Sequence, residues 1–259
     1  MPDFNITAIV LRRMQYGETD NILTLYSRER GRISAIAKGA RKAVSRLSGA
    51  TELLCRSKFS LASAKTLQIV RQAEVVASYP ALREDLTRLA NGLYAADLLS
   101  AFVTDDDPNP DLFDLLDAAL NLISVVKAPS LAARWYEIRL LDELGYAPIL
   151  TECIFCRAAL SPARPGIIAL SASQGGVLCH RHCDPQRFDD QSALSRPSLQ
   201  LLQRLSDLKT LPDLFDNGIL ENREFDDRQT AYALRRYIRF RTDHDLKSLQ
   251  FLDTLRKSD

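Results

Sequence analysis

The sequence lacks most of the motifs that mark common enzymes. Its 259 residues include three histidines and one tryptophan, with no Gly-x-Ser-x-Gly and no His-Glu-x-x-His pattern. The stretch "GARKAVS" does not form a phosphate-binding loop, because the Gly-Lys-Ser/Thr ending of that motif is absent. These absences argue against serine hydrolases, zinc peptidases and P-loop nucleotide hydrolases. We expect a protein that is not an enzyme.

Long hydrophobic runs are also absent. No stretch of 18 uncharged apolar residues occurs, and the first thirty residues lack the apolar core of a secretory signal. We therefore expect no membrane span and no membrane partner, and we place the protein in the cytoplasm.

Net charge is nearly absent as well, but the charges are unevenly distributed. Residues 1–75 hold 13 Lys and Arg against 6 Asp and Glu, whereas residues 76–150 hold 5 against 12. This asymmetry favours a polyanion partner for the N-terminal part. The alternative is that the two segments form salt bridges with each other.

Residues 5–76 read as β-structure. Five short runs rich in Ile, Leu, Val and Thr are separated by turn-prone stretches such as "YGETD" and "RERG". Five strands in about seventy residues fit the partly open barrel of the oligonucleotide-binding (OB) fold, although a small sandwich or an SH3-like barrel would also fit.

The pattern then changes to helical spacing. Leu82, Leu86, Leu89 and Leu93 follow a three-to-four-residue period, which predicts a helix from Pro80 onward. We predict an α+β multidomain chain, in which a five-stranded OB barrel precedes a helical domain with an inserted zinc-binding element. The expected segments are the barrel at 1–78, helices at 79–150, the zinc element at 151–185 and further helices at 186–259.

Four of the five cysteines cluster within 31 residues. Cys153 and Cys156 form "CIFC", and Cys179 and Cys183 bound "CHRHC". Two such turns about twenty residues apart are typical of one structural Zn²⁺ ion. The fourth ligand is either His182 or Cys183, with His180 a weaker candidate, and we favour Cys183. Reduced unliganded thiols or a redox pair are the alternatives.

A concentration of positive charge follows the third predicted strand. Lys38, Arg41, Lys42 and Arg46 lie within "AIAKGARKAVSR", which has no acidic residue. On an OB barrel these residues would line one rim, and the same face could be extended by Arg30, Arg32, Lys58 and Lys65. Tyr26 and Phe59 are candidate stacking platforms, although core positions suit them better. A cationic groove beside aromatic rings holds single strands without reading their sequence.

The stretch "AIVLRRMQYGETDNILTLYSRERGRISAIAKGARKAVSR", followed by "CIFC", "GGVLC" and "LKSLQFLDTL", resembles the bacterial RecO (recombination protein O) family. The resemblance implies binding of single- and double-stranded DNA and annealing of complementary strands. It also implies a role in the RecF pathway of DNA repair and recombination. There the protein, together with RecR, would help to load RecA onto DNA coated by single-stranded DNA-binding protein. A cytoplasmic, nucleoid-associated location would follow.

The resemblance further implies DNA contacts at the basic segment, and zinc ligands at Cys153, Cys156 and Cys179. Two other classes stay open on the residues alone. One is a non-catalytic zinc-containing scaffold whose basic barrel docks an acidic protein tail or RNA, and the other is a zinc hydrolase. For the C-terminal arginines Arg235, Arg236, Arg239 and Arg241, DNA contact and a solvated face are both open.

Overall fold

The computed structural model describes residues 3–64, 66–160, 168–184, 190–210, 228–242 and 246–258. The chain forms two compact units, one of residues 1–125 with 246–259 and the other of residues 126–245. This division differs from the four predicted segments, because the first helices and the last helix share a unit with the barrel.

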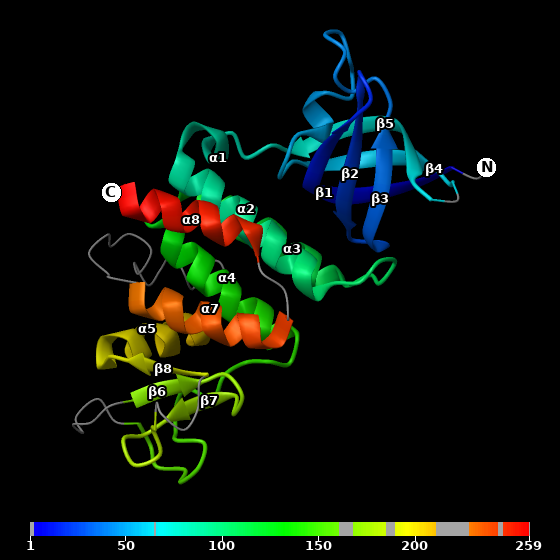
Figure 1. Ribbon diagram of the computed structural model, residues 1–259. Helices are drawn as coiled ribbons and strands as arrows, with labels where there is room; N and C mark the ends of the chain where they lie inside the picture. Colours follow the sequence, from blue (N-terminus) through cyan, green and yellow to red (C-terminus); the bar gives the residue numbers. More distant parts are fainter. Residues whose placement is uncertain are drawn as a thin grey trace. The chain divides into compact units, whose positions relative to one another are not determined.

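The N-terminal part of the first unit is a closed five-stranded barrel (Figure 1). Its strands are β1 (Asp3–Tyr16), β2 (Asp20–Ser27), β3 (Gly31–Ala37), β4 (Arg56–Ala62) and β5 (Gln68–Ala77). They are ordered β1-β2-β3-β5-β4, and only the short β3–β5 contact is parallel. The predicted barrel followed by helices is thus confirmed, and the topology is that of an OB fold.

The barrel interior is filled by alternate residues of each strand. Ile6, Ala8 and Val10 of β1 face inward with Leu23 and Leu25 of β2, and all five are at most 3% exposed. Because side chains alternate along a strand, the residues between them lie on the outer face, where Ile9 is also buried, at 0% exposure. The segment between β3 and β4 contains the short 3₁₀ helix η1 (Gly49–Thr51), which packs against β4 and β5, and another part of the segment projects from the barrel (Figure 1).

The remaining elements of the first unit are helical. They are α1 (Ala81–Glu84), α2 (Leu86–Phe102), α3 (Pro110–Val125) and α8 (Lys247–Ser258). The last helix packs against α2, where the Ser248 backbone N–H and hydroxyl both donate to Asp97 Oδ2, at 3.2 and 2.8 Å. The C-terminal segment therefore completes the unit that holds the barrel.

The second unit combines helices with a small sheet. Its helices are α4 (Pro129–Glu143), α5 (Arg196–Asp207) and α7 (Arg228–Thr242), and its strands are β6 (Ile168–Ser171), β7 (Gly176–Leu178) and β8 (Gln191–Leu194). The sheet is antiparallel in the order β7-β6-β8. Trp135 of α4 lies in the core at 2% exposure, and its indole N–H donates to the Leu208 carbonyl at 2.7 Å.

Candidate nucleic-acid and metal sites

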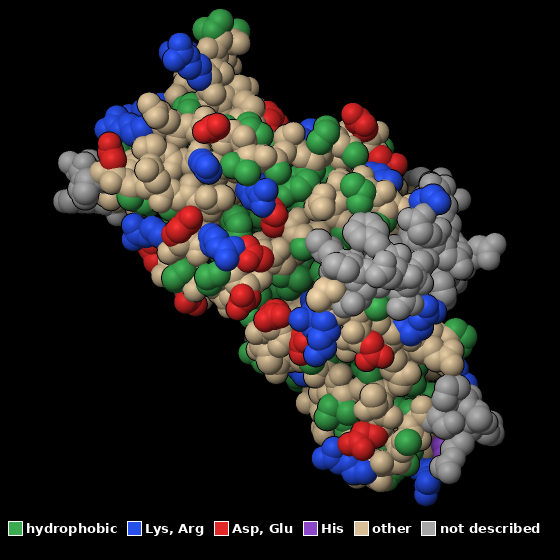
Figure 2. Space-filling model, turned by 180° about the vertical axis from the view of Figure 1, so that it is seen from behind, with side chains coloured by type: hydrophobic (Ala, Val, Ile, Leu, Met, Phe, Trp, Pro, Cys, Tyr) green, Lys and Arg blue, Asp and Glu red, His purple; other side chains and the backbone are tan. Residues whose placement is uncertain are grey.

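The basic loop lies against the tip of the β1–β2 hairpin. The Arg41 backbone N–H donates to the Thr19 carbonyl at 2.9 Å, and its guanidinium donates to the Gly17 carbonyl at 3.2 Å. Lys38, Arg41 and Lys42 are all exposed. Within the described residues, none of these three cations has a carboxylate within ion-pair distance. Figure 2 shows Lys or Arg and hydrophobic side chains on the projecting part of the barrel.

One carboxylate fixes this loop to the hairpin. Asp20 Oδ1 accepts a hydrogen bond from the Gly39 backbone N–H at 2.8 Å and another from the Thr19 hydroxyl at 3.1 Å. The bond from Gly39 is the largest cause that lowers the pKa of Asp20, and the nearby charges of Lys38 and Lys42 lower it further. Gly39 itself has φ +66°, a conformation that glycine adopts without strain.

The outer surface of β1, β2 and β3 next to the loop is partly apolar. Met14 pairs with Ile22, Ile22 with Ile36 and Ile36 with Ile69, so these side chains form one row across four strands. Met14 is 48% exposed and Tyr16, two residues further along β1, is 55% exposed. Tyr16 is therefore the aromatic side chain that this surface offers. Tyr16 was not singled out from the sequence, although its position directly before Gly17 of the hairpin turn could have indicated an exposed side chain.

The two aromatic residues considered from the sequence are in the core instead. Tyr26 is 0% exposed and Phe59 is 1% exposed, which leaves neither ring available for stacking. Burial raises the pKa of Tyr26 to about 12, and the Asp107 charge adds to the rise. Phe59 faces the barrel interior, whereas Tyr26 follows the inward-facing Leu25 and so lies on the opposite face of β2, where its hydroxyl donates to the Asn109 carbonyl at 3.3 Å.

Arg46 and Lys58 lie in a different place from the loop tip. Both line a groove of about 770 Å³ formed by β1, β4, β5 and the end of the basic loop. Arg71 of β5 lines the same groove and was not singled out from the sequence. All three cations are exposed, and none is paired with a carboxylate in the part of the chain that the structure describes.

Arg30 and Arg32 form ion pairs with carboxylates of the same unit. Arg32 Nε donates to Asp105 Oδ1 at 2.6 Å and its Nη1 donates to the Ser100 carbonyl at 2.9 Å. Arg30 lies 3.7 Å from Asp106 Oδ1. The structure therefore does not group these two arginines with the free cations of the loop. The acidic stretch that follows α2 neutralises them.

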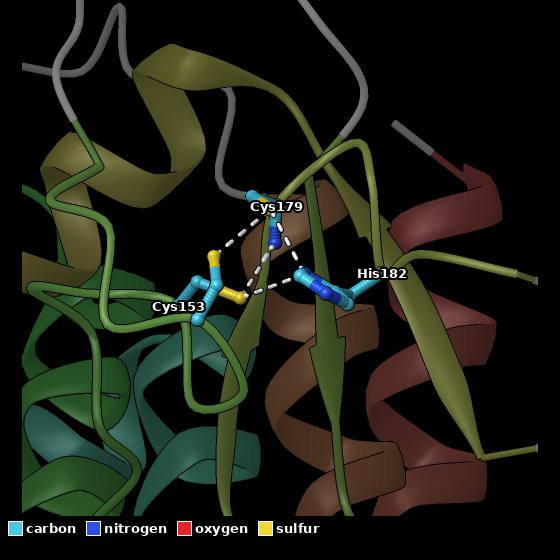
Figure 3. Close-up of side chains that lie close together, drawn as sticks. Cys153, Cys179 and His182 are labelled. Atoms are coloured by element: carbon cyan, nitrogen blue, oxygen red, sulfur yellow. Dashed lines mark hydrogen bonds between the residues drawn. The ribbon is translucent and has the colours of Figure 1, made fainter.

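Four side chains from two turns form a separate cluster in the second unit. The ligand atoms of Cys153, Cys156, Cys179 and His182 all lie within 4.8 Å of one another. Cys156 Sγ is 3.8 Å from Cys179 Sγ, and His182 Nδ1 is 3.6 Å from Cys153 Sγ and 3.3 Å from Cys179 Sγ (Figure 3). Sulfur ligands at about 2.3 Å from a tetrahedral zinc ion are about 3.8 Å apart, so the group fits that ion.

The local backbone explains why these side chains converge. The Ile154 backbone N–H donates to the Val177 carbonyl at 3.1 Å, which ties the first turn to β7 just before Cys179. A side chain at Gly176 would place its Cβ 2.8 Å from the Ile149 carbonyl oxygen. Glycine at this position therefore permits the close approach of the two turns.

The fourth member of the cluster corrects the sequence prediction. We favoured Cys183, but the described cluster contains His182 in its place. The turn after Cys179 closes with the His182 backbone N–H on the Cys179 carbonyl at 2.8 Å, which directs the third residue after Cys179 toward the thiols. Cys183, one residue later, is not part of the cluster. His180, the weaker candidate, is exposed and outside the cluster.

The cluster stabilises thiolate at one of its cysteines. Burial by itself raises the pKa of Cys153, but backbone N–H groups of Cys156, Cys179 and Phe155 lower it to about 6. Burial raises the pKa of Cys179. Four protein donors would complete a tetrahedral shell and leave no position for substrate, which is the arrangement of a structural metal site.

Two of the C-terminal arginines have roles inside the second unit. Arg241 donates to the Ala172 carbonyl at 2.9 Å and lies over the Tyr237 ring at 4.3 Å, and Arg236 donates to the Gln191 carbonyl at 3.1 Å. These bonds connect α7 to the small sheet. Lys65, considered for the basic face, lies outside the described residues.

No helix in the described part of the chain is both long and apolar enough to cross a membrane.

Comparisons with known proteins place the whole chain in one family. The family model "Recombination protein O N terminal" matches residues 1–79, and "Recombination protein O C terminal" matches residues 83–250. The chain is 38% identical to "DNA repair protein RecO" of Pelotomaculum thermopropionicum over 96% of this chain and 93% of the relative. It is 36% identical to the protein of the same name from Heliobacterium modesticaldum over 98% of this chain and 91% of the relative. This chain belongs to the RecO family of DNA repair proteins.

Proposed function

We propose that this chain binds single- and double-stranded DNA through the basic loop of its barrel and anneals complementary strands. The supporting observation is that Lys38, Arg41 and Lys42 are exposed beside the hairpin tip without a carboxylate partner among the described residues. Phosphate groups attract such cations, and the affinity that results does not depend on base sequence.

The neighbouring surface supports contact with unpaired bases. The row that contains Met14 and Ile22 offers apolar area, and the exposed Tyr16 ring offers a stacking partner. Annealing requires no covalent chemistry, since a cationic surface that neutralises two strands lowers their repulsion and leaves base edges free. A catalytic role is therefore not part of the proposal.

The metal cluster fits the same proposal as a structural element. One Zn²⁺ ion would be held by Cys153, Cys156, Cys179 and His182 and would stabilise the turns around β7. As the family resemblance implies, the chain would act with RecR to help load RecA onto DNA coated by single-stranded DNA-binding protein. The N-terminal and C-terminal family matches support this role.

The salt dependence of DNA binding tests the proposal. If about five phosphates are engaged on a single strand, log Kd should change with log salt by a slope of about 3.5, or roughly a hundredfold between 50 and 200 mM. Changing Lys38, Arg41 and Lys42 together to Ala should lower that slope by about 2 and weaken all sequences alike. The measurement is fluorescence anisotropy with labelled oligonucleotides of mixed sequence.

The matched control is the pair Arg30→Ala and Arg32→Ala, which removes barrel charge that Asp106 and Asp105 already neutralise. It should change DNA affinity less than twofold per residue. A binding constant that stays flat across the salt range contradicts the proposal. Binding of an acidic peptide or of RNA in preference to DNA would favour the scaffold alternative.

A further inference from the structure

The groove between β1, β4 and β5 is separate from the apolar row on β1, β2 and β3. Its lining includes Arg46, Lys58 and Arg71, together with the polar side chains of Asn5, Gln72 and Glu74. The apolar row pairs Met14, Ile22 and Ile36 on other strands. Arg46 belongs to the basic loop and also lines the groove, so its cationic side chain lies where the loop meets the groove.

Register explains how the groove gathers its polar groups. Thr7 pairs with Lys58 and Lys58 pairs with Glu74, so these three side chains point outward in one row. Asn5, Ser60 and Gln72 form the next row in the same way. The ladder shifts between Ser60 and Leu61, next to the position of Arg71 on the paired strand. Two outward rows and an irregularity thus create a polar groove on a barrel surface.

The chemistry of the lining fits a nucleotide. Its three cations have no carboxylate partner among the described residues, so they can bind a phosphate group. Its amide and carboxylate side chains can bind base edges, which carry both donors and acceptors. The volume of about 770 Å³ lies within the range of small-ligand sites, about 300–1,000 Å³. The side chains of an acidic peptide fit less well, because they offer only acceptors, whereas base edges also offer donors to the carboxylates of the groove.

We infer that this groove is a second single-strand site, which holds an unpaired segment of nucleic acid with its phosphates on Arg46, Lys58 and Arg71. The inference rests on the proposed function and deepens it. One barrel would hold one strand along the loop and the β1–β3 surface and another in the groove. Both strands of an annealing pair would then be bound by a single chain.

The number of strands bound per chain tests the inference. An oligonucleotide of about six nucleotides, near the lower end of the site sizes of OB folds, is too short to occupy both places. Calorimetric titration of the full chain at low salt should show two copies of this hexamer oligonucleotide bound per chain. The double variant Lys58→Ala and Arg71→Ala should give one, and its annealing rate for complementary strands should fall about tenfold.

Two further variants separate this inference from the proposed function. The triple loop variant Lys38→Ala, Arg41→Ala and Lys42→Ala should lose one hexamer and keep the one in the groove. Arg30→Ala, whose charge Asp106 neutralises, should keep both. All the substituted side chains are exposed, and unchanged thermal unfolding would verify that each variant folds.

A single hexamer per wild-type chain, unaffected by the Lys58 and Arg71 changes, would overturn the inference and leave the proposed function intact. Binding of an oligo-glutamate peptide that depends on Arg71 would overturn it too. If neither the wild type nor any variant binds the hexamer, the proposed function fails as well.

Discussion

Asp20 shows how a single side chain positions the basic loop. Its carboxylate accepts from the Gly39 backbone N–H, and it also lies near Lys38 and Lys42. Residues 38–46 contain no strand or helix, so the loop is held by single bonds such as this one and the two that Arg41 donates to the Thr19 and Gly17 carbonyls. A charged acceptor forms a stronger hydrogen bond than a neutral one, which makes this contact the main restraint at Gly39.

Replacing Asp20 with Ala should therefore loosen the loop. We expect trypsin to cut after Arg41, Lys42 or Arg46 several times faster in this variant than in the wild type, because exposed, unrestrained backbone is the preferred site of cleavage. The control is Glu18→Ala, which removes a neighbouring exposed carboxylate. Equal cleavage rates in the two variants would contradict the role of Asp20.

The same contact has a definite pH dependence. The folded pKa of Asp20 lies below its ordinary value of 3.8. The contribution of the carboxylate is therefore complete above that value and is lost as the pH falls through the lower folded pKa. Loop cleavage by an acid-active protease should rise in that acidic range in the wild type and stay constant in Asp20→Ala.

At the scale of elements, the metal cluster depends on a turn of defined length. Cys-x2-His at Cys179 and His182 brings Nδ1 to the thiols, and the ring of Phe155 stacks on His182 with centroids 5.6 Å apart. Cys183 lies one residue too far along the same turn. Since both residue types can bind zinc, it is the backbone geometry that places His182 rather than Cys183 in the cluster.

We predict that His182→Ala lowers the zinc content of the purified chain from about one per molecule to well below half, and its thermal midpoint by about 5–10 °C. Cys183→Ser should leave both unchanged. His182→Cys should restore zinc, because a thiolate can take the same corner of the tetrahedron. Elemental analysis and thermal unfolding measure these outcomes, and zinc loss in Cys183→Ser with retention in His182→Ala would reverse the assignment.

The helix α2 shows a second effect at this scale. Leu82, Leu86 and Leu89 suggested one helix with a leucine stripe. The helix is instead interrupted at Asp85, which has an extended backbone and caps α2 by accepting a hydrogen bond from the Arg88 backbone N–H at 2.8 Å. Leu86 is 62% exposed. The buried stripe contains Ala90, Tyr94 and other residues instead, because small residues and Gly92 allow close packing, with Leu54 only 2.9 Å from a Cβ placed there.

At the scale of the first unit, the uneven charges of the sequence serve two purposes. Arg28 pairs with Asp114, Arg32 with Asp105 and Arg56 with Asp117, which joins the barrel to the acidic segment around α3. Other barrel cations, such as Lys42 and Lys58, remain without carboxylate partners in the described chain. The salt-bridged interface and the polyanion site are therefore both compatible with the same asymmetry.

Asp117 is the most enclosed carboxylate of this network, with a side chain 22% exposed, and it also accepts from the Tyr79 hydroxyl. Asp117→Asn should lower the free energy of unfolding by about 1–3 kcal/mol, because it weakens two hydrogen bonds of a charged acceptor. Urea unfolding followed by circular dichroism measures the change. The control Asp111→Asn, an exposed carboxylate on the same helix, should change it by less than about 0.5 kcal/mol; equal effects would contradict the role of Asp117.

The sequence alone determined the features that depend on local pattern. Alternation of apolar residues was sufficient for the barrel, and Cys153 with Cys156 was sufficient to predict one turn of the Cys3His cluster, because both signals are set by neighbours along the chain. The basic loop could be identified from the sequence for the same reason, because its cations lie within twelve consecutive residues.

Only the tertiary structure decided which charged side chains stay available. Arg30 and Lys58 look alike in the sequence, but Arg30 meets Asp106 from a segment 76 residues away, and Lys58 meets Arg46 and Arg71 in a groove. Likewise the path of one turn selected His182 over Cys183. Partners distant in the chain are fixed by strand register and helix packing, and these depend on the whole unit rather than on any local stretch.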